Sequence, residues 1–279
     1  MAKKPYAESA NQPRTQKRYL TDCTDTEWVI IEPLTRKSPG PGRKRRVNLR
    51  EVVNAIFYRT HTGCQWRMFP KEFPARSTIW YYYNMWTEDG TWDKINATLR
   101  RMVRRSVGKH DDPSLAIIDS QTVKATESGG ERGYDGAKQV NGRKRHIMVD
   151  TLGLLLLVMV HAADIQDYVA AEGVLTSAHH RFAGLLKVIA DTIYGYSGLP
   201  EWVKTHLGFI LEIVKRDPQR KGFYPIAKRW IVERSFAWFG RDRILSKEYE
   251  RRTESSESDV YIASIRLLLR RLDRASMAG

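Results

Sequence analysis

The chain has 279 residues and a formal net charge of +15, with 47 Lys and Arg against 32 Asp and Glu. Hydrophobic residues make up 42% and charged residues 28% of the sequence, a globular composition that excludes disordered and fibrous proteins. The positive surplus indicates a polyanionic partner, either nucleic acid or an acidic membrane surface.

Secreted and membrane-spanning proteins fit the sequence poorly. No basic segment followed by an apolar run opens the chain. The longest apolar run, Leu154 to Val160, is far shorter than the roughly 20 residues that span a bilayer. Two cysteines exclude a disulfide scaffold and a four-thiolate zinc site, and they fit a reducing compartment. We therefore expect a cytoplasmic protein with no membrane partner.

Helix signals begin after a polar, basic segment, residues 1–20, which we predict to be a flexible arm. Thr24 with Glu27 and Asn48 with Glu51 form two capping boxes, each before apolar residues at helical spacing. We expect Ser77 to cap a short aromatic helix, and a last helix over residues 92–105. The aromatic run at residues 80–83 fits core packing better than stacking on bases.

Short helices joined by turns and rich in basic residues indicate a helix-turn-helix-like DNA-binding domain over residues 21–110. The alternative is a small helical bundle that the charges merely solvate. Residues 1–110 carry 22 Lys and Arg against 10 Asp and Glu, whereas residues 111–279 carry 25 against 22. The candidate DNA contacts in this part are Arg43, Lys44, Arg45, Arg46, Arg76, Ser77 and Thr78.

The pattern changes to strands at residue 115. Five apolar runs have strand length: Leu115 to Ile118, His146 to Val149, Leu154 to Val160, Leu185 to Ala190 and Phe209 to Val214. The first three are too close together for intervening helices, so they indicate a meander. Helical patterns follow at residues 168–180, 196–206 and 225–240. We predict an α/β (α+β) fold, a mixed five-stranded sheet flanked by helices, over residues 111–279.

Two aspartates follow apolar runs directly. Asp119 comes after residues 116–118 and Asp191 after residues 188–190, which places both at the carboxyl ends of predicted strands, where sites form in open α/β sheets. If these strands are neighbours, the carboxylates face each other and need a cation between them. Hard divalent ions such as Mg²⁺ prefer oxygen ligands.

Glu233 is the best third acid. Its helical neighbours Trp230 and Ala237 indicate an apolar, sheet-facing stripe, where a glutamate is costly without a partner or metal. An ion pair with Arg229, at i−4, is the alternative, and both are compatible if Arg229 also holds a scissile phosphate. We interpret Asp150 as a turn former and Asp164 and Asp167 as helix caps that compete with Asp191 for the second position.

Several basic residues of this second part are candidate DNA contacts. We interpret Gly142 to His146 as a loop that touches phosphate, with a solvated β-turn as the alternative. The candidates are Arg143, Lys144, Arg145, His146, Arg229, Arg234 and Arg241.

Long specific strings in the chain resemble the bacterial insertion-sequence transposases with a DDE triad, in insertion-sequence group five. The similarity covers nearly the whole sequence. The strings are Gly63 to Arg67, Ile118 to Lys124, Glu127 to Gly130, Arg132 to Asp135, Gly142 to His146, Val149 to Leu154 and Arg229 to Trp238.

The resemblance implies a ribonuclease-H-like catalytic domain with Asp119, Asp191 and Glu233 as the triad. It also implies two Mg²⁺ ions per site, for which Mn²⁺ substitutes, and metal-dependent cleavage at inverted-repeat ends followed by strand transfer into target DNA. A homodimer or higher synaptic assembly follows from the need to pair two ends. No small-molecule substrate is expected.

The match to the broader transposase signature is partial. Ile226 stands where the signature has tyrosine and Gly240 where it has lysine, although Arg241 follows at once. The residues after Asp191 also differ from the family's usual basic residue and glycine. Two alternatives therefore stay open: a catalytically silent DNA-binding protein derived from a transposase, and a structure-selective nuclease on the same fold.

Overall fold

The computed structural model describes residues 18–35, 47–214 and 228–277, with the side chains of 274–277 excepted. Its N-terminal region is helical, as predicted. The elements are α1 (Asp25–Thr35), α2 (Leu49–Thr62), the short 3₁₀ turn η1 (Trp66–Met68), α3 (Arg76–Glu88) and α4 (Thr91–Ser106).

Two of the three predicted N-terminal caps, Thr24 and Asn48, are present in the structure. At the start of α1, the Thr24 N–H donates to the Glu27 carboxylate (2.8 Å) and the Glu27 N–H donates to Thr24 Oγ1 (3.0 Å), a complete capping box. Asn48 caps α2 by accepting from the Arg50 N–H at 2.9 Å, and Glu51 pairs with Arg18. Ser77 does not cap α3, because the N-cap position of this helix is Ala75.

A mixed sheet follows. Its strands are β1 (Leu115–Lys124), β2 (Gly133–Asp135), β3 (Val140–Asp150), β4 (Leu155–Ala162), β5 (Lys187–Ala190) and β6 (Ile210–Ile213). The order is β2-β3-β1-β5-β6, with β4 also on β3. β1, β3 and β4 form the predicted antiparallel meander, and β5 and β6 add in parallel. All five predicted strands are present, and β2 adds a short one.

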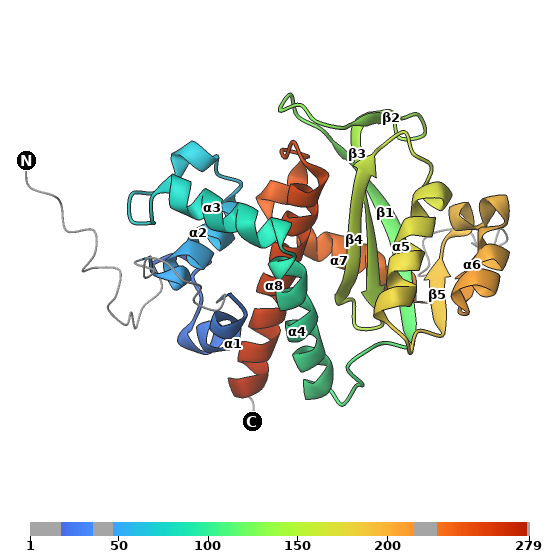
Figure 1. The fold of residues 1–279 in the computed structure, drawn as a ribbon, viewed down its shortest axis with the longest axis horizontal. Helices are drawn as coiled ribbons and strands as arrows, with labels where there is room; N and C mark the ends of the chain where they lie inside the picture. Colours follow the sequence, from blue (N-terminus) through green and yellow to red (C-terminus); the bar gives the residue numbers. More distant parts are fainter. Residues whose placement is uncertain (1–17, 36–46, 215–227, 278–279) are drawn as a thin grey trace, which may run out of the picture.

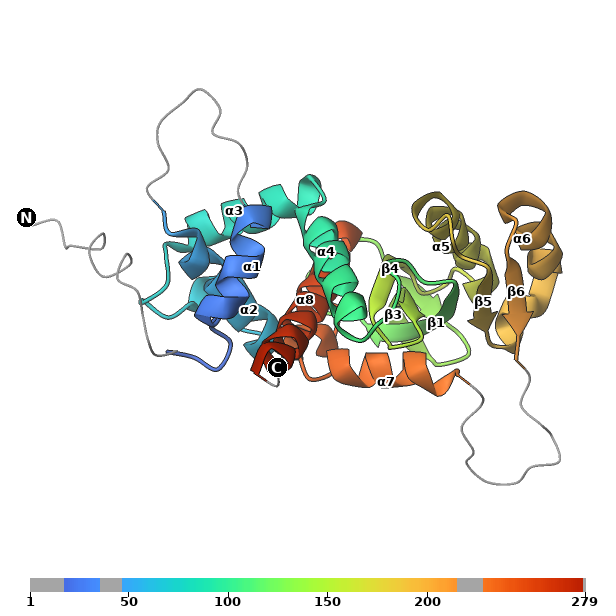
Figure 2. The same ribbon diagram turned by 90° about the horizontal axis from the view of Figure 1, so that it is seen from below.

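Helices cover both faces of this sheet (Figure 2). They are α5 (Asp167–Arg181), the 3₁₀ segment η2 (Thr192–Gly198), α6 (Leu199–Leu207), α7 (Trp230–Phe239), the 3₁₀ turn η3 (Arg243–Ser246) and α8 (Thr253–Met277). α5 and α6 lie on one face and α7 on the other. The apolar side chains divide accordingly: Ile118 of β1 packs toward α5, and Ile117 belongs to the cluster on the α7 side. The alternation along β1 thus assigns each residue a face.

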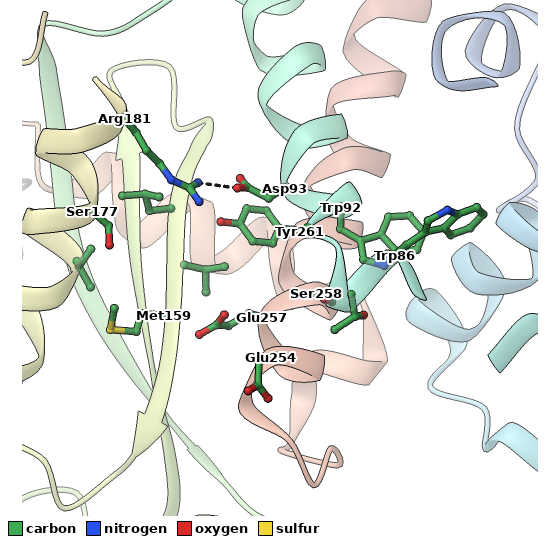
Figure 3. A pocket seen from close by; sticks show the side chains of 15 residues that line it. Trp86, Trp92, Asp93, Met159, Ser177, Arg181, Glu254, Glu257, Ser258 and Tyr261 are labelled. Atoms are coloured by element: carbon green, nitrogen blue, oxygen red, sulfur yellow. Dashed lines mark ion pairs between the residues drawn. The ribbon is translucent and has the colours of Figure 1, made fainter. Parts of the chain in front are cut away.

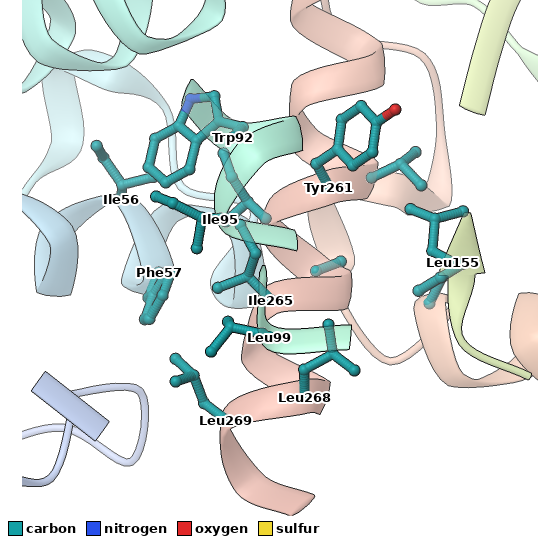
Figure 4. Packing of buried hydrophobic residues seen from close by; sticks show 14 of the residues in the cluster. Ile56, Phe57, Trp92, Ile95, Leu99, Leu155, Tyr261, Ile265, Leu268 and Leu269 are labelled. Atoms are coloured by element: carbon teal, nitrogen blue, oxygen red, sulfur yellow. The ribbon is translucent and has the colours of Figure 1, made fainter. Parts of the chain in front are cut away.

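The long C-terminal helix α8 lies between the N-terminal helices and the sheet (Figure 1). Its Ile265, Leu268 and Leu269 pack with Leu99 of α4 and Phe57 of α2 (Figure 4). The same apolar cluster continues to Leu155 of β4 and to Val232 of α7. The helical region and the sheet therefore share one core, and the proposed boundary at residue 110 does not coincide with a break in packing. The fold is a ribonuclease-H-like α/β domain joined to a helical N-terminal region.

Buried arginines tie the two regions together. Arg59 of α2 pairs with Asp259 of α8 at 3.0 Å and also with Glu250. Arg104 of α4 pairs with the fully buried Asp150 at the end of β3. Part of the basic surplus thus lies inside the protein, where each charge needs its partner.

Arg18 and Tyr19, at the end of the predicted arm, pack on the helical region: Arg18 pairs with Glu51, and Tyr19 stacks on Phe73 at 5.3 Å between ring centroids. Residues 1–17 lie outside the described part of the chain. No described helix is both long and apolar enough to cross a membrane.

Candidate active site

β1 and β5 bring the first two acids to one edge of the sheet. The strands are parallel neighbours, with Leu115 opposite Lys187 and Ile117 opposite Ile189. Asp191 directly follows β5, as predicted. Asp119 does not end β1: the strand continues to Lys124 because it stays paired with β3 after it has separated from β5. The aspartate still lies only two residues beyond the last parallel pair.

Glu233 is on α7, but not on the stripe that the spacing predicted. The buried residues of α7 are Ile231, Val232, Ser235 and Phe239, while the Glu233 side chain is 51% exposed. The periodicity predicted the helix correctly and its rotation wrongly, because Trp230, taken as a sheet-facing neighbour, lies 42% exposed. Glu233 is therefore not buried, and its place in the candidate site depends on its contact with Arg229.

Arg229 joins the acids of two distant elements. Its Nη2 lies 3.4 Å from Asp191 Oδ2, and its Nε lies 3.7 Å from Glu233 Oε1. The ion pair with Glu233 considered from the sequence therefore exists, and the same guanidinium also contacts Asp191. One cation thus lies between two carboxylates that are 42 positions apart in the chain.

Asp119 belongs to the same group. Burial raises the pKa of its carboxyl to about 6. The Ser120 N–H, which donates to Asp119 Oδ1 at 2.8 Å, and the Arg229 guanidinium act the other way, while the charges of Asp191 and Glu233 raise the pKa further. The pKa of Asp119 therefore depends on the charges of both other acids and of Arg229. A half-buried carboxyl whose pKa is raised and which lies within electrostatic range of two other acids is a candidate for binding a cation.

The competing aspartates have other partners. Asp150 accepts hydrogen bonds from the Leu152 and Leu154 N–H groups, both at 2.9 Å, which confirms its interpretation as a turn former. Asp167 is the first residue of α5, after the N-cap Gln166, so the prediction that it caps the helix is wrong. Asp164 is exposed in the preceding turn.

A buried polar cluster lies behind Asp119, on the opposite face of β1. Ser120 Oγ donates to Asp167 Oδ2 at 2.9 Å, and Lys144 Nζ lies 2.9 Å from Asp167 Oδ1. Sequence reasoning missed this group. Its only signal is the alternation along β1, which turns Ser120 away from the face of Asp119. The cluster anchors β1 to α5 next to the acid.

Two cavities lie near the sheet. One of about 300 Å³ is lined by Trp86, Asp93, Arg181, Glu257 and Tyr261 among others, and Arg181 pairs with Asp93 across it at 2.7 Å (Figure 3). None of the three acids lines it. A second of about 200 Å³ is lined by β1, α7 and η3 residues, including Gln121, which is on the same strand face as Asp119.

Comparison with known families gives two matches. A family model for transposases of the IS4/5 family matches residues 23–96, and the model of the transposase DDE domain matches residues 110–264. The second match covers more than half of the chain. The chain belongs to the DDE transposases. No curated protein matches it. The family is one of polynucleotidyl transferases that act on DNA, and its domains generally use divalent metals.

The donor set of this transposase fits such a metal by chemistry. Arg229 contacts the carboxylates of Asp191 and Glu233, and Asp119 lies on the strand next to β5; carboxylate oxygens are the ligands that Mg²⁺ and Mn²⁺ prefer. Among the described residues, no three His, Cys, Asp or Glu side chains are arranged as a ready metal site. Arg229 instead supplies the positive charge between Asp191 and Glu233.

The transposase does not expose the predicted basic loop. Arg143, Lys144, Arg145 and His146 lie inside β3 and are at most 5% exposed. Arg143 donates to the carbonyl oxygens of Glu131, Glu250 and Arg251, and Arg145 pairs with Glu248 at 3.0 Å. The prediction of a phosphate-contacting loop is wrong, because these side chains are buried against partners within the protein.

The other candidate DNA contacts divide into two groups. Arg234 is half-buried between the rings of Trp230 and Trp238, at 4.5 and 4.6 Å from their centroids, and donates to the Leu152 carbonyl. Arg76, Ser77 and Arg241 are exposed, and Thr78 and Arg229 are half-buried. Arg43 to Arg46 and Ile226 lie outside the described residues.

Proposed function

We propose that this transposase cleaves DNA at the ends of an insertion sequence and joins the freed ends to target DNA, with Asp119, Asp191 and Glu233 as its catalytic acids and Mg²⁺ as its metal. The observation that carries the proposal is the convergence of three acids from β1, the end of β5 and α7 around Arg229.

The acids would hold the two divalent ions, with Mn²⁺ able to substitute for Mg²⁺. When bound, such ions activate the attacking water or 3′-hydroxyl and stabilise the leaving oxygen of an in-line displacement. Arg229 is in position to bind the scissile phosphate, since its guanidinium lies between two of the acids. The fixed backbone of β1 and β5 keeps Asp119 and Asp191 in place, which is the positioning that phosphoryl transfer needs.

DNA contacts in the proposal come from the exposed candidates. Arg76, Ser77 and Thr78 at the start of α3 would hold the terminal repeats, and Arg241 after α7 would hold the strand near the acids. Arg43 to Arg46 remain candidates for setting the salt dependence of binding. We further propose that the protein acts on the nucleoid in the cytoplasm as a homodimer or higher assembly that pairs two ends.

A nicking assay tests the proposal. The substrate is a supercoiled plasmid that carries the DNA flanking the coding region, incubated with Mg²⁺ or Mn²⁺. Asp119→Ala and Glu233→Gln are each expected to abolish nicking while binding to the flanking DNA persists, because the fold and the α3 surface are unchanged. Asp164→Asn is the matched control, since Asp164 is an exposed residue of the turn before α5.

Three outcomes would contradict the proposal. Full nicking by Asp119→Ala or Glu233→Gln removes the triad assignment. Metal-independent binding with no nicking by the wild-type chain favours the catalytically silent DNA-binding protein. Nicking of branched DNA with no preference for the flanking sequences favours the structure-selective nuclease.

A further inference from the structure

The aromatic residues of α3 divide between its two faces. Ile79, Tyr82, Tyr83 and Trp86 are buried against the helical core, with at most 9% exposure. Trp80 and Tyr81 lie on the other side, 50% and 57% exposed. The core interpretation of this aromatic run is therefore correct for one face of the helix only. Two neighbouring large aromatic side chains that are exposed to solvent indicate a binding surface.

The exposed aromatics belong to a continuous stripe. Arg76, Ser77, Trp80, Tyr81 and Asn84 follow one another at i+3 and i+4 spacing, so they share one face of α3, which we call the α3 outer stripe. Arg76, Ser77, Trp80 and Tyr81 are exposed, and Asn84 is half-buried. The stripe combines one cation, two hydrogen-bonding side chains and two flat rings. Among the described elements, α3 packs mainly on α2, α4, α8 and η1.

The charge of the protein favours DNA over a second copy of the chain as the partner of this face. Residues 66–81 carry three Lys and Arg against one Glu, and the whole chain carries +15. A second copy of the chain would bring a second positive surface to the stripe, whereas DNA brings the opposite charge. An α-helix fits the major groove of B-DNA, and α3 lies on the side of α8 away from the sheet (Figure 1). Arginine, serine and asparagine are also the residue types that bind phosphates and base edges.

We propose that the α3 outer stripe binds duplex DNA in the major groove, with Trp80 and Tyr81 as the residues that determine which sequence is bound. The rings contact thymine methyl groups and the faces of deoxyribose, Asn84 and Ser77 donate to and accept from base edges, and Arg76 binds a backbone phosphate. This inference rests on the proposed function, since it names the surface by which the transposase selects its DNA ends.

The test is a selection from a random 20-base-pair duplex library with the full chain, followed by affinity measurements on the enriched duplex and on a scrambled duplex of the same composition. The Trp80→Gln/Tyr81→Gln double variant is expected to lose at least tenfold in affinity for the enriched duplex and less than threefold for the scrambled one. Its salt dependence is expected to stay unchanged, because no cation is removed. Arg76→Ala is expected to weaken both duplexes alike and to reduce the salt slope by about one.

Matched variants separate a binding role from a folding role. Leu186→Ala/Ile210→Ala removes two exposed apolar side chains, 67% and 53% exposed, from the far end of the sheet and is expected to leave both affinities unchanged. Trp80→Phe/Tyr81→Phe keeps the rings and is expected to retain most of the selectivity. Replacing thymine by uracil in the enriched duplex is expected to weaken the wild-type chain more than the glutamine variant.

These measurements distinguish an error about the α3 outer stripe from an error about the proposed function. A glutamine variant with wild-type selectivity, or a wild-type chain that binds DNA without enriching any sequence, overturns the role of the stripe while nicking at the triad stands. A wild-type chain that binds no duplex at any salt concentration overturns the proposed function itself.

Discussion

Two buried aspartates, Asp150 and Asp259, pair with arginines of the helical N-terminal region and so join it to the rest of this transposase. Asp150 is fully buried at the end of β3. One of its oxygens accepts from two N–H groups of the following turn, and the other pairs with Arg104 of α4. The turn and the interface between the regions therefore depend on one side chain, and a buried cation is left alone if that side chain is removed.

Asp150→Ala is expected to lower the free energy of unfolding by about 3–5 kcal/mol, because it leaves Arg104 buried and unpaired and two turn N–H groups without an acceptor. Urea denaturation followed by circular dichroism measures the change. Asp164→Ala, at an exposed turn position, is the control and is expected to change the free energy by less than about 0.5 kcal/mol. A loss below 1 kcal/mol in Asp150→Ala would contradict this account.

Glu257 gives the protein a pH dependence. It lines the 300 Å³ cavity, accepts from the Val160 N–H at 2.9 Å, and burial raises its pKa to about 7 (Figure 3). Because the folded-state pKa is above the unfolded one, the protonated form favours the fold. Stability therefore falls as pH rises from about 4.5 to 7, with no further loss from this group above that window.

Glu257→Gln keeps an oxygen for the Val160 N–H and removes the charge. We expect the variant to be more stable than the wild type at pH 8, by about 1–3 kcal/mol, and equal to it near pH 4. Thermal unfolding across this pH range measures the difference. A difference that does not depend on pH would show that Glu257 is not the titrating group.

At the scale of elements, α7 is the helix on which the site depends, because it carries Glu233 and follows Arg229 directly. Its hold on the sheet is specific. Ser235 Oγ donates to the Gly153 carbonyl at 2.9 Å, and Arg234 is stacked between two tryptophans. Gly153 has φ +79°, and an added Cβ would lie 2.9 Å from Ser235 Oγ, so only glycine allows this approach.

Arg234→Ala is expected to lower the free energy of unfolding by about 1–2 kcal/mol through loss of its cation–π contacts and of its hydrogen bond to Leu152. Nicking is expected to fall as well, because α7 loses its fixed rotation and Glu233 moves with it. Arg234→Lys, which keeps the charge and loses the planar stack, should be intermediate in both measurements. Wild-type thermal stability in Arg234→Ala would refute the anchoring role.

The sequence predicted elements better than it predicted orientations. The strand runs, the N-terminal caps Thr24 and Asn48 and the meander of the first three predicted strands followed from local patterns, which depend on neighbours within a few residues. The face of Glu233 and the fate of Arg143 and Arg145 did not, because their environment is made by segments that lie far away in the chain. A run of basic residues in the sequence is typical of a solvent-exposed loop. In the structure, the side chains of Arg143 and Arg145 are instead paired with Glu248 and with backbone carbonyls of residues 245–251.

At the scale of the whole molecule, α8 joins the helical N-terminal region to the sheet. It packs on α2, α3 and α4 and on β4, and its Asp259 neutralises Arg59 within the helical core. The helical region therefore lacks one wall of its core until the last segment of the chain is present. The helical region and the sheet are thus held in a fixed relation, with α8 packed between them.

A fragment of residues 1–110 is expected not to unfold cooperatively on its own, because Leu99, Ile56 and Phe57 lose their contacts with α8. The same fragment linked to residues 253–277 is expected to regain a cooperative transition. Denaturation followed by tryptophan fluorescence measures both. A cooperative transition in residues 1–110 alone would instead support an independent DNA-binding domain with the boundary predicted from the sequence.

We propose that Asp119, Asp191 and Glu233 form one metal-binding group. Titration of the full chain with Mn²⁺, followed by electron paramagnetic resonance of the free ion, tests this assignment without any DNA. We expect Asp119→Asn, Asp191→Asn and Glu233→Gln each to weaken Mn²⁺ binding at least tenfold, while the exposed control Asp164→Asn binds as the wild type does. Unchanged Mn²⁺ affinity in any one of the three triad variants would contradict it.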